Sequence, residues 1–134
     1  MTEKEKNVMT QELWALTAMN AVATKHLLEI SARQLKCIAR ENADEMTPNK
    51  QKVIEEMQLQ WNFVTKIHED LSEIAEKSGQ SELVPALEEF DISDDLWDVE
   101  NGGLKSRICD VSEKIGDFQN VMMNAIWNLQ KHYK

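Results

Sequence analysis

Histidines, cysteines and carboxylates are the side chains of this chain whose chemistry could support a metal site or proton transfer. The three histidines are His26, His68 and His132. A di-iron helical bundle requires Glu-x-x-His pairs, and a zinc site on a helix requires two histidines four residues apart. None of the three histidines satisfies either spacing. We therefore expect no metal and no other cofactor.

The histidines and the two cysteines have structural interpretations instead. His68 is expected at the edge of the core, with a carboxylate nearby in the sequence. His26 is expected in a surface pair with Glu29, three residues on. Cys37 and Cys109 lie within helical patterns without a neighbouring histidine, so we expect inert core thiols in a reduced, cytoplasmic protein. The sequence contains no catalytic motif, and we do not expect an enzyme.

The charged residues that stand out most lie between Ser78 and Leu104. This stretch holds eight acids and no Lys, Arg or His, whereas the rest of the chain holds 16 acids and 15 bases. Nearly the whole net charge of -9 is therefore carried by one connector. The candidate partner-binding residues are acids and aromatics of this stretch: Glu88, Glu89, Phe90, Asp91, Asp94, Asp95, Trp97, Asp98 and Glu100.

Three interpretations of this acidic connector are open. It could be a solvated linker whose acids maintain solubility and cap short helices. It could be a contact surface for a basic protein, with Phe90 and Trp97 as hydrophobic anchors and the carboxylates steering the approach. It could also bind calcium, because four of its aspartates are close together, although the order of ligands in an EF-hand is not met.

Composition and charge argue against several classes of partner. The basic residues are scattered, whereas nucleic-acid phosphates and anionic membranes are bound by clustered Lys and Arg. The most apolar window, residues 13–24, is about half as long as a membrane span. The N-terminus is polar and lacks the apolar run of a secretory signal. We expect neither a nucleic-acid nor a membrane partner.

Helices are the elements that would position these residues, since apolar residues recur at steps of three and four. The first helix is predicted from Thr10, its N-cap, to Ala43. Residues 3–9 could extend it, although their polarity makes residues 1–9 prone to fraying. Its apolar positions form two adjacent stripes, which indicates neighbours on two sides. One stripe is Trp14, Ala18, Ala21, Leu28, Ala32, Leu35 and Ala39. The other is Leu13, Leu16, Ala23, Leu27, Ile30 and Cys37.

The second helix has the clearest boundaries in the sequence. Thr47 and Pro48 are typical of the N-cap and first helical positions, and the helix is predicted to run to Ser78, with Gly79 in the left-handed conformation. So short a link between two long helices predicts an antiparallel hairpin. The inward stripe is Ile54, Met57, Trp61, Val64, Ile67, Leu71 and Ile74, widened by Leu59 and Phe63.

Two short helices are predicted within the acidic connector. The first is capped by Ser81 and covers residues 82–89, with Pro85 early enough to be tolerated or to bend it. The second is capped by Asp91 or Ser93 and ends at the following glycine pair.

The last helix is predicted from Leu104 to His132. Its inward stripe is Leu104, Ile108, Val111, Ile115, Phe118, Met122, Ile126 and Leu129. Gly116 interrupts this helix and indicates a site of close helix contact. The tryptophans on or beside the helical stripes, Trp14, Trp61 and Trp127, are expected to be core anchors.

These elements predict a single all-α domain over residues 1–134. The predicted fold is an antiparallel bundle of three long helices with a short helical acidic insert, residues 78–104, between the last two. The insert could fold back as a partial fourth helix.

Three functional hypotheses follow from this pattern. The first is a non-enzymatic protein-binding protein, of the inhibitor, immunity, chaperone or adaptor type, that presents the acidic, aromatic-bearing insert to a basic partner protein. The alternative is a self-assembling, dimeric structural protein, because the first helix carries more apolar surface than one hairpin partner can cover and Trp127 lies off the main stripe. The third is an enzyme whose site is assembled from distant helices.

Overall fold

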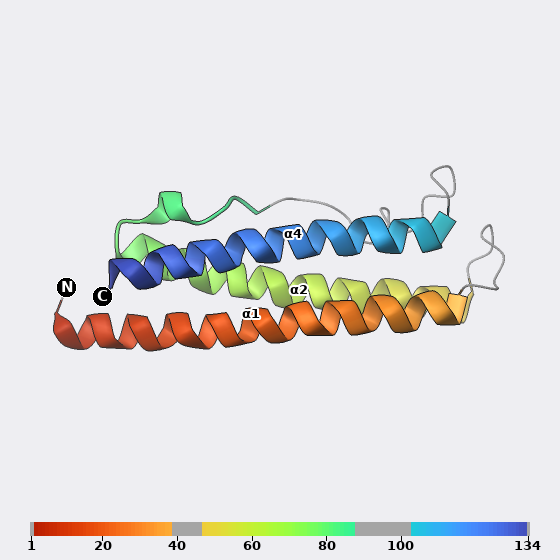
Figure 1. Cartoon of the computed structure of the whole chain (residues 1–134), viewed down its shortest axis with the longest axis horizontal. Helices are drawn as coiled ribbons and strands as arrows, with labels where there is room; N and C mark the ends of the chain where they lie inside the picture. The colour runs from red at the N-terminus through yellow and green to blue at the C-terminus, as the bar shows by residue number, and fades with distance from the viewer. Residues whose placement is uncertain (1, 39–46, 88–102, 134) are drawn as a thin grey trace.

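Three long helices make up most of the computed structural model, which describes residues 2–38, 47–87 and 103–133 (Figure 1). Helix α1 spans Glu3–Ile38, helix α2 spans Pro48–Lys77 and helix α4 spans Gly103–His132. One turn of 3-10 helix, η1, spans Ser81–Leu83. The all-α bundle of three long helices predicted from the sequence is confirmed.

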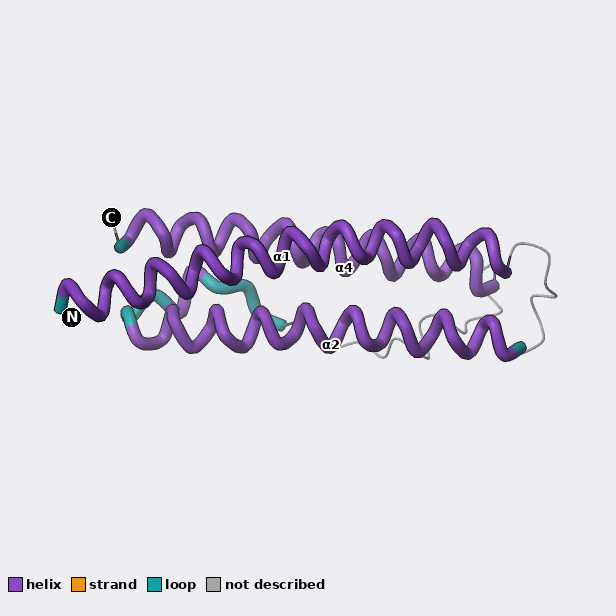
Figure 2. The backbone as a smooth tube through the Cα atoms, turned by 90° about the horizontal axis from the view of Figure 1, so that it is seen from below, coloured by secondary structure: helices purple, strands orange, loops and turns teal. Residues whose placement is uncertain are grey.

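Helix α1 runs antiparallel to both of its neighbours, so α2 and α4 point in the same direction (Figures 1 and 2). The connector of residues 78–102 therefore joins the end of α2 to the start of α4 at the opposite end of the bundle. At roughly 3.3 Å per residue this connector can extend to about 80 Å, whereas α2 is about 45 Å long. Since η1 contacts both α2 and α4, the connector starts along the seam between the two parallel helices.

The core is built from positions that alternate at steps of three and four along each helix. This is the spacing of helices that pack side by side with interdigitated side chains. The buried positions of α1 are Leu13, Leu16, Asn20, Ala23, Leu27 and Ile30. Those of α2 include Val53, Met57, Gln60, Val64, Ile67, Leu71 and Ile74, and those of α4 include Ile108, Val111, Ile115, Phe118, Met122, Ala125 and Leu129. The predicted stripes of α2 and α4 are confirmed wherever their side chains are described. The predicted widening of the α2 stripe by Leu59 and Phe63 is wrong, because both side chains are exposed.

Only one of the two apolar stripes predicted on α1 is buried. In the other stripe, Trp14 and Leu28 are 60% and 67% exposed, and its described alanines are exposed as well. Helix α1 does contact two neighbours, α2 and α4. Both neighbours pack against the buried stripe, because the three helices share one core. The second stripe stays exposed, with Leu28 at the rim of the α1/α4 seam.

Two of the three tryptophans predicted as core anchors lie outside the core. Trp61 is buried, with its ring centroid 5.6 Å from that of Phe118. Trp14 and Trp127 are exposed, the latter to 55%. Each follows a buried residue, and successive residues on a helix are rotated by ~100°, so both side chains turn toward solvent. The prediction is confirmed for Trp61 and wrong for the other two.

The predicted boundaries of α2 are confirmed at both ends. The backbone N–H of Lys50 donates to Thr47 Oγ1 at 3.3 Å, as expected of an N-cap, and Pro48 opens the helix. At the other end, Gly79 has a φ of 72°. The backbone N–H groups of Gly79 and Gln80 donate to the carbonyls of Glu76 and Ala75 at 3.1 and 2.8 Å, the paired bonds of a Schellman cap.

Helix α1 begins at Glu3, so residues 3–9 extend it and the predicted N-cap at Thr10 is wrong. The predicted end at Ala43 lies outside the described residues. The backbone N–H of Glu5 donates to Thr2 Oγ1 at 3.2 Å, so Thr2 is the N-cap. The sequence Thr2-x-x-Glu5 matches the capping-box pattern, a signal that the sequence prediction missed. Thr10 lies inside the helix, where its hydroxyl donates to the carbonyl of Lys6 at 2.9 Å.

The first short helix predicted in the connector is reduced to the single turn η1. Its N-cap position is Gln80, not Ser81, and Val84 is extended, with φ -96° and ψ 129°. The reason is Pro85, because a residue that precedes proline is sterically disfavoured in the helical conformation. The last residues of this predicted helix, and all of the second short helix, lie outside the described residues.

Gly116 is not a site of close helix contact, contrary to the prediction. A Cβ atom built at this position meets no neighbouring heavy atom within 4 Å. The glycine lies at the rim of the seam between α1 and α4, where it lines a shallow recess together with Leu28.

Candidate partner-binding surfaces

The partner-binding residues predicted in the acidic insert lie outside the described residues. They are Glu88, Glu89, Phe90, Asp91, Asp94, Asp95, Trp97, Asp98 and Glu100. What the structure describes is the segment that leads into them, residues 78–87, and the helix that follows them, α4.

The start of the insert is attached to the bundle by one hydrogen bond and two apolar side chains. Leu83 and Val84 are partly buried and pack against the core. The ring of His68 lies 5.6 Å from that of Phe118, and His68 Nε2 lies 2.7 Å from the carbonyl oxygen of Pro85. Because a carbonyl oxygen only accepts, Nε2 must be the protonated ring nitrogen. His68 is at the core edge as predicted, but its partner is this carbonyl, not a neighbouring carboxylate.

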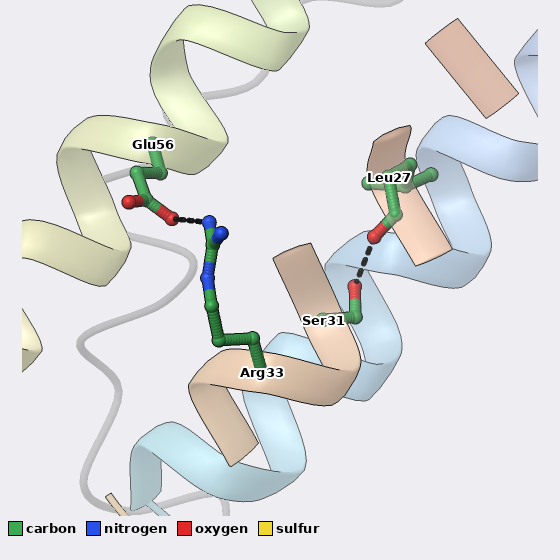
Figure 3. Close-up of polar contacts among 4 residues, drawn as sticks. All are labelled: Leu27, Ser31, Arg33 and Glu56. Carbon is green, nitrogen blue, oxygen red and sulfur yellow. Dashed lines mark hydrogen bonds and ion pairs between the residues drawn. The ribbon is translucent and has the colours of Figure 1, made fainter. Parts of the chain in front are cut away.

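An apolar groove runs along the outer side of the seam between α1 and α2. It has a volume of about 430 Å³ and is lined by Val22, His26, Ile30, Arg33, Glu56, Leu59, Gln60 and Phe63. Val22 and Leu59 are 64% and 67% exposed. At one end Arg33 reaches from α1 to α2, where its Nη2 lies 2.9 Å from Glu56 Oε2 (Figure 3). We call these lining residues the apolar half of the α1/α2 groove.

A second, separate recess lies between the same two helices, toward the N-terminal end of α1. It has a volume of about 330 Å³ and is lined by Glu12, Ala15, Leu16, Met19, Asp70, Glu73, Ile74 and Lys77. Three of its lining side chains are carboxylates and one is an ammonium. Nearby, Lys66 Nζ lies 3.1 Å from Asp70 Oδ1. We call these lining residues the acidic half of the α1/α2 groove.

Lys66 lies beside the acidic half of the groove and interacts with its carboxylates. The hydrogen bond and charge of Asp70 raise the pKa of the Lys66 ammonium, and the charges of Glu69 and Glu73 raise it further. A cation is therefore favoured at this position by carboxylates from two successive turns of α2. Carboxylates therefore outnumber bases among the residues that line this end of the groove, although the bundle outside the insert is close to neutral.

Sequence reasoning placed Leu59 and Phe63 at the edge of the core and did not single out Val22. The groove could have been predicted from the spacing of buried positions, which alternates between three and four residues. Positions 57, 60, 64 and 67 of α2 follow this alternation and are buried, which leaves residues 59 and 63 at flanking positions that need another neighbour for burial.

Other exposed apolar side chains line neither half of the groove. They include Trp14 and Leu28, which lie about four turns apart on α1, and Trp127 on α4. The ammonium of Lys131 lies 3.5 Å from the ring centroid of Trp127, a cation–π contact that covers part of this ring. Cys109 is also exposed, so the prediction of a core thiol is wrong for this residue. The side chain of Cys37 is outside the described set.

The bundle also contains a buried layer of amides that the sequence prediction did not identify. Asn20 Nδ2 donates to the backbone carbonyl of Gln119 at 3.0 Å, and Gln60 Nε2 donates to that of Ala23 at 2.7 Å. Among the described residues, both amide atoms of the Gln119 side chain lack a hydrogen-bond partner. The layer couples α1 to both of its neighbours.

Within residues 2–38, 47–87 and 103–133, no three His, Cys, Asp or Glu side chains are grouped so that they could hold a metal ion. In the same part of the chain no helix is long and apolar enough to cross a membrane. No protein family, no curated protein and no solved structure matches this chain.

Proposed function

We propose that this protein is a non-enzymatic, protein-binding helical bundle that presents its acidic insert to a basic partner protein. The observation that carries the proposal is the attachment of residues 81–85 to α2 and α4 through Leu83, Val84 and the His68–Pro85 hydrogen bond. The insert thus leaves the bundle from a fixed point and returns directly into a long helix, α4. Attachment at both ends lowers the conformational entropy that binding must remove.

The chemistry of the insert selects a basic partner. Its eight carboxylates, without a compensating base, would accelerate the encounter with a positively charged surface. Phe90 and Trp97 would supply the apolar anchors that account for most of the binding energy in many interfaces. Inhibitors, immunity factors, chaperones and adaptors work in this way. A reducing, cytoplasmic setting is part of the proposal and is supported by the exposed thiol of Cys109.

Charge reversal in the insert tests the proposal. The triple variant Asp94→Lys, Asp95→Lys, Asp98→Lys should lose a partner that the wild-type protein captures from lysate of the native host. A matched control reverses three exposed acids on the helices, Glu29, Glu113 and Asp117, and should retain the partner. Mass spectrometry identifies what is captured, and thermal melting by circular dichroism checks that both variants fold. Equal capture by the wild-type protein and the insert variant would contradict the proposal.

A self-assembling protein is the second candidate function, and the exposed apolar side chains favour it. Trp14, Leu28 and Trp127 are each more than half exposed, and a second copy of the chain could bury them. Multi-angle light scattering at micromolar concentration distinguishes the two functions. A dimer that Trp14→Ser converts to a monomer would favour self-assembly, whereas a monomeric wild-type protein would exclude it as the main role.

A further inference from the structure

The α1/α2 groove has the dimensions of a helix-binding site. Its two halves together are lined by residues 12–33 of α1 and residues 56–77 of α2. At ~1.5 Å per residue this seam is about 30 Å long, the length of a helix of roughly 20 residues. Helix α1 runs antiparallel to α2, and the two recesses follow one another along the seam between them. A fourth helix placed along this seam would complete a four-helix bundle.

We infer that the α1/α2 groove binds an amphipathic helix of a partner protein, with the apolar face of that helix on Val22, Leu59 and Phe63 and basic residues at one end over Glu12, Asp70 and Glu73. The inference rests on the proposed function in one respect, the basic character of the partner. It adds a second binding surface, on a different seam from the insert, and it states the secondary structure of the bound segment.

The apolar half of the groove provides the contact area for such a helix. Val22 and Leu59 are each more than 60% exposed, so covering them removes apolar surface from water. The residues of each wall are spaced by four, with His26 following Val22 and Phe63 following Leu59. Side chains spaced in this way lie one above another on a helix, and they form the walls into which residues i, i+3 and i+4 of a bound helix fit.

The acidic half of the groove determines the charge of the bound segment. Glu12, Asp70 and Glu73 line it, with Lys77 as the one basic side chain among its lining residues. Lys66 is paired with Asp70, and Glu69 and Glu73 also favour its ammonium. At the other end of the seam, the Arg33–Glu56 pair is neutral overall. An apolar helix with basic residues at one end therefore has the charge distribution that complements this groove.

A designed peptide tests the inference on the full-length protein. The probe is a fluorescein-labelled helix of roughly 21 residues, with leucines along one face and lysines toward one end. A second peptide carries glutamates in place of the lysines. Fluorescence anisotropy should show binding of the lysine peptide, and binding of the glutamate peptide should be at least ~10-fold weaker. The difference should shrink at high salt, where exposed charges are screened.

Two leucines of equal exposure provide the variant and its control. Leu59, in the groove, and Leu28, outside it, are both 67% exposed, so replacing either by glutamine should leave the fold intact. Leu59→Gln should weaken binding of the lysine peptide about 10-fold, as expected when a buried leucine contact is lost. Leu28→Gln should change the affinity by less than about twofold, because Leu28 does not line the groove.

Three outcomes would overturn the inference. One is an equal loss of affinity in Leu28→Gln and Leu59→Gln. Another is loss of peptide binding in the triple insert variant but not in Leu59→Gln, which would assign the peptide to the insert and support the proposed function alone. The last is a wild-type dimer in light scattering that Leu59→Gln dissociates, since the groove would then bind a second copy. If the insert variant still binds the lysine peptide and Leu59→Gln does not, the result supports the α1/α2 groove as the binding site, independently of the insert.

Discussion

The two seams along α1 differ in how their outer edges are filled. On the α4 side, short polar residues join the helices, with Ser31 Oγ 2.6 Å from Ser112 Oγ and Gln130 Nε2 donating to Thr17 Oγ1 at 3.4 Å. On the α2 side, the edge holds the exposed apolar side chains Leu59 and Phe63. The α4 side also has a recess, at Leu28 and Gly116, but polar side chains form hydrogen bonds across that seam. On the α2 side, Val22, Leu59 and Phe63 together line the larger recess.

The same comparison identifies which residues of α1 stabilise the bundle and which are available for binding. The buried stripe beneath both seams forms one core. A few exposed apolar residues outside this core are common on protein surfaces and destabilise the fold little. These are the residues that a partner can contact.

The largest effect is expected for the shared core. Leu27→Ala should lower the free energy of unfolding by about 2–5 kcal/mol, because the side chain is buried and its removal leaves a cavity. Leu28→Ala, one residue further, should change it by less than about 0.5 kcal/mol, because Leu28 is exposed. Urea unfolding followed by circular dichroism measures both. Similar losses in the two variants would mean that Leu28 is buried in solution, as a dimer would require.

A smaller effect of opposite sign is expected for the buried amide on the α4 side. Gln119→Leu should raise the free energy of unfolding by about 1–2 kcal/mol, since the side-chain amide is buried without a partner among the described residues. Gln60→Leu, on the α2 side, should raise the free energy of unfolding less than Gln119→Leu does, or lower it. The reason is that it removes the hydrogen bond to the carbonyl of Ala23. A greater loss in Gln119→Leu than in Gln60→Leu would show that the Gln119 amide is satisfied in solution.

The smallest effect is expected for Gly116, at the rim of the α4 side. Gly116→Ala should stabilise the protein by about 0.5–1 kcal/mol, because alanine favours the helix and its methyl group meets no atom within 4 Å. Gly79→Ala is the matched contrast. Gly79 has a φ of 72°, so alanine there should destabilise the protein by about 1 kcal/mol. Differential scanning calorimetry measures the Tm of both variants. A Tm of Gly116→Ala below that of the wild-type protein would contradict the finding that a Cβ atom at this position has free space.

Local sequence signals predicted the parts of the fold that depend on a few adjacent residues. Thr47, Pro48 and Gly79 set the ends of α2 through their own backbone preferences, so no tertiary information was needed. The inward stripes of α2 and α4 were equally accessible, because their spacing fixes which side chains share a face. A misread local signal explains the start of α1, where Thr2-x-x-Glu5, and not Thr10, marks the N-cap.

The errors arose where the outcome depends on neighbours that periodicity does not reveal. Two apolar stripes on α1 indicated two neighbours, but not that both would pack on one stripe and leave Trp14 and Leu28 exposed. The partner of His68 is a carbonyl 17 residues away, across a change of chain direction. Val22, Leu59 and Phe63 form a groove only because α1 and α2 are antiparallel in this register. The predicted residues of the acidic insert lie outside the described residues, and their role stays a prediction.

The comparison of the two seams is tested most directly by nuclear magnetic resonance of methyl-labelled protein titrated with the lysine peptide. The largest chemical-shift changes should appear at Val22, Ile30 and Leu59, which line the α1/α2 groove, with little change at Leu28 and Val121. Changes concentrated at Leu28, or spread evenly over both seams, would contradict the assignment of the α1/α2 groove as the binding surface of the bundle.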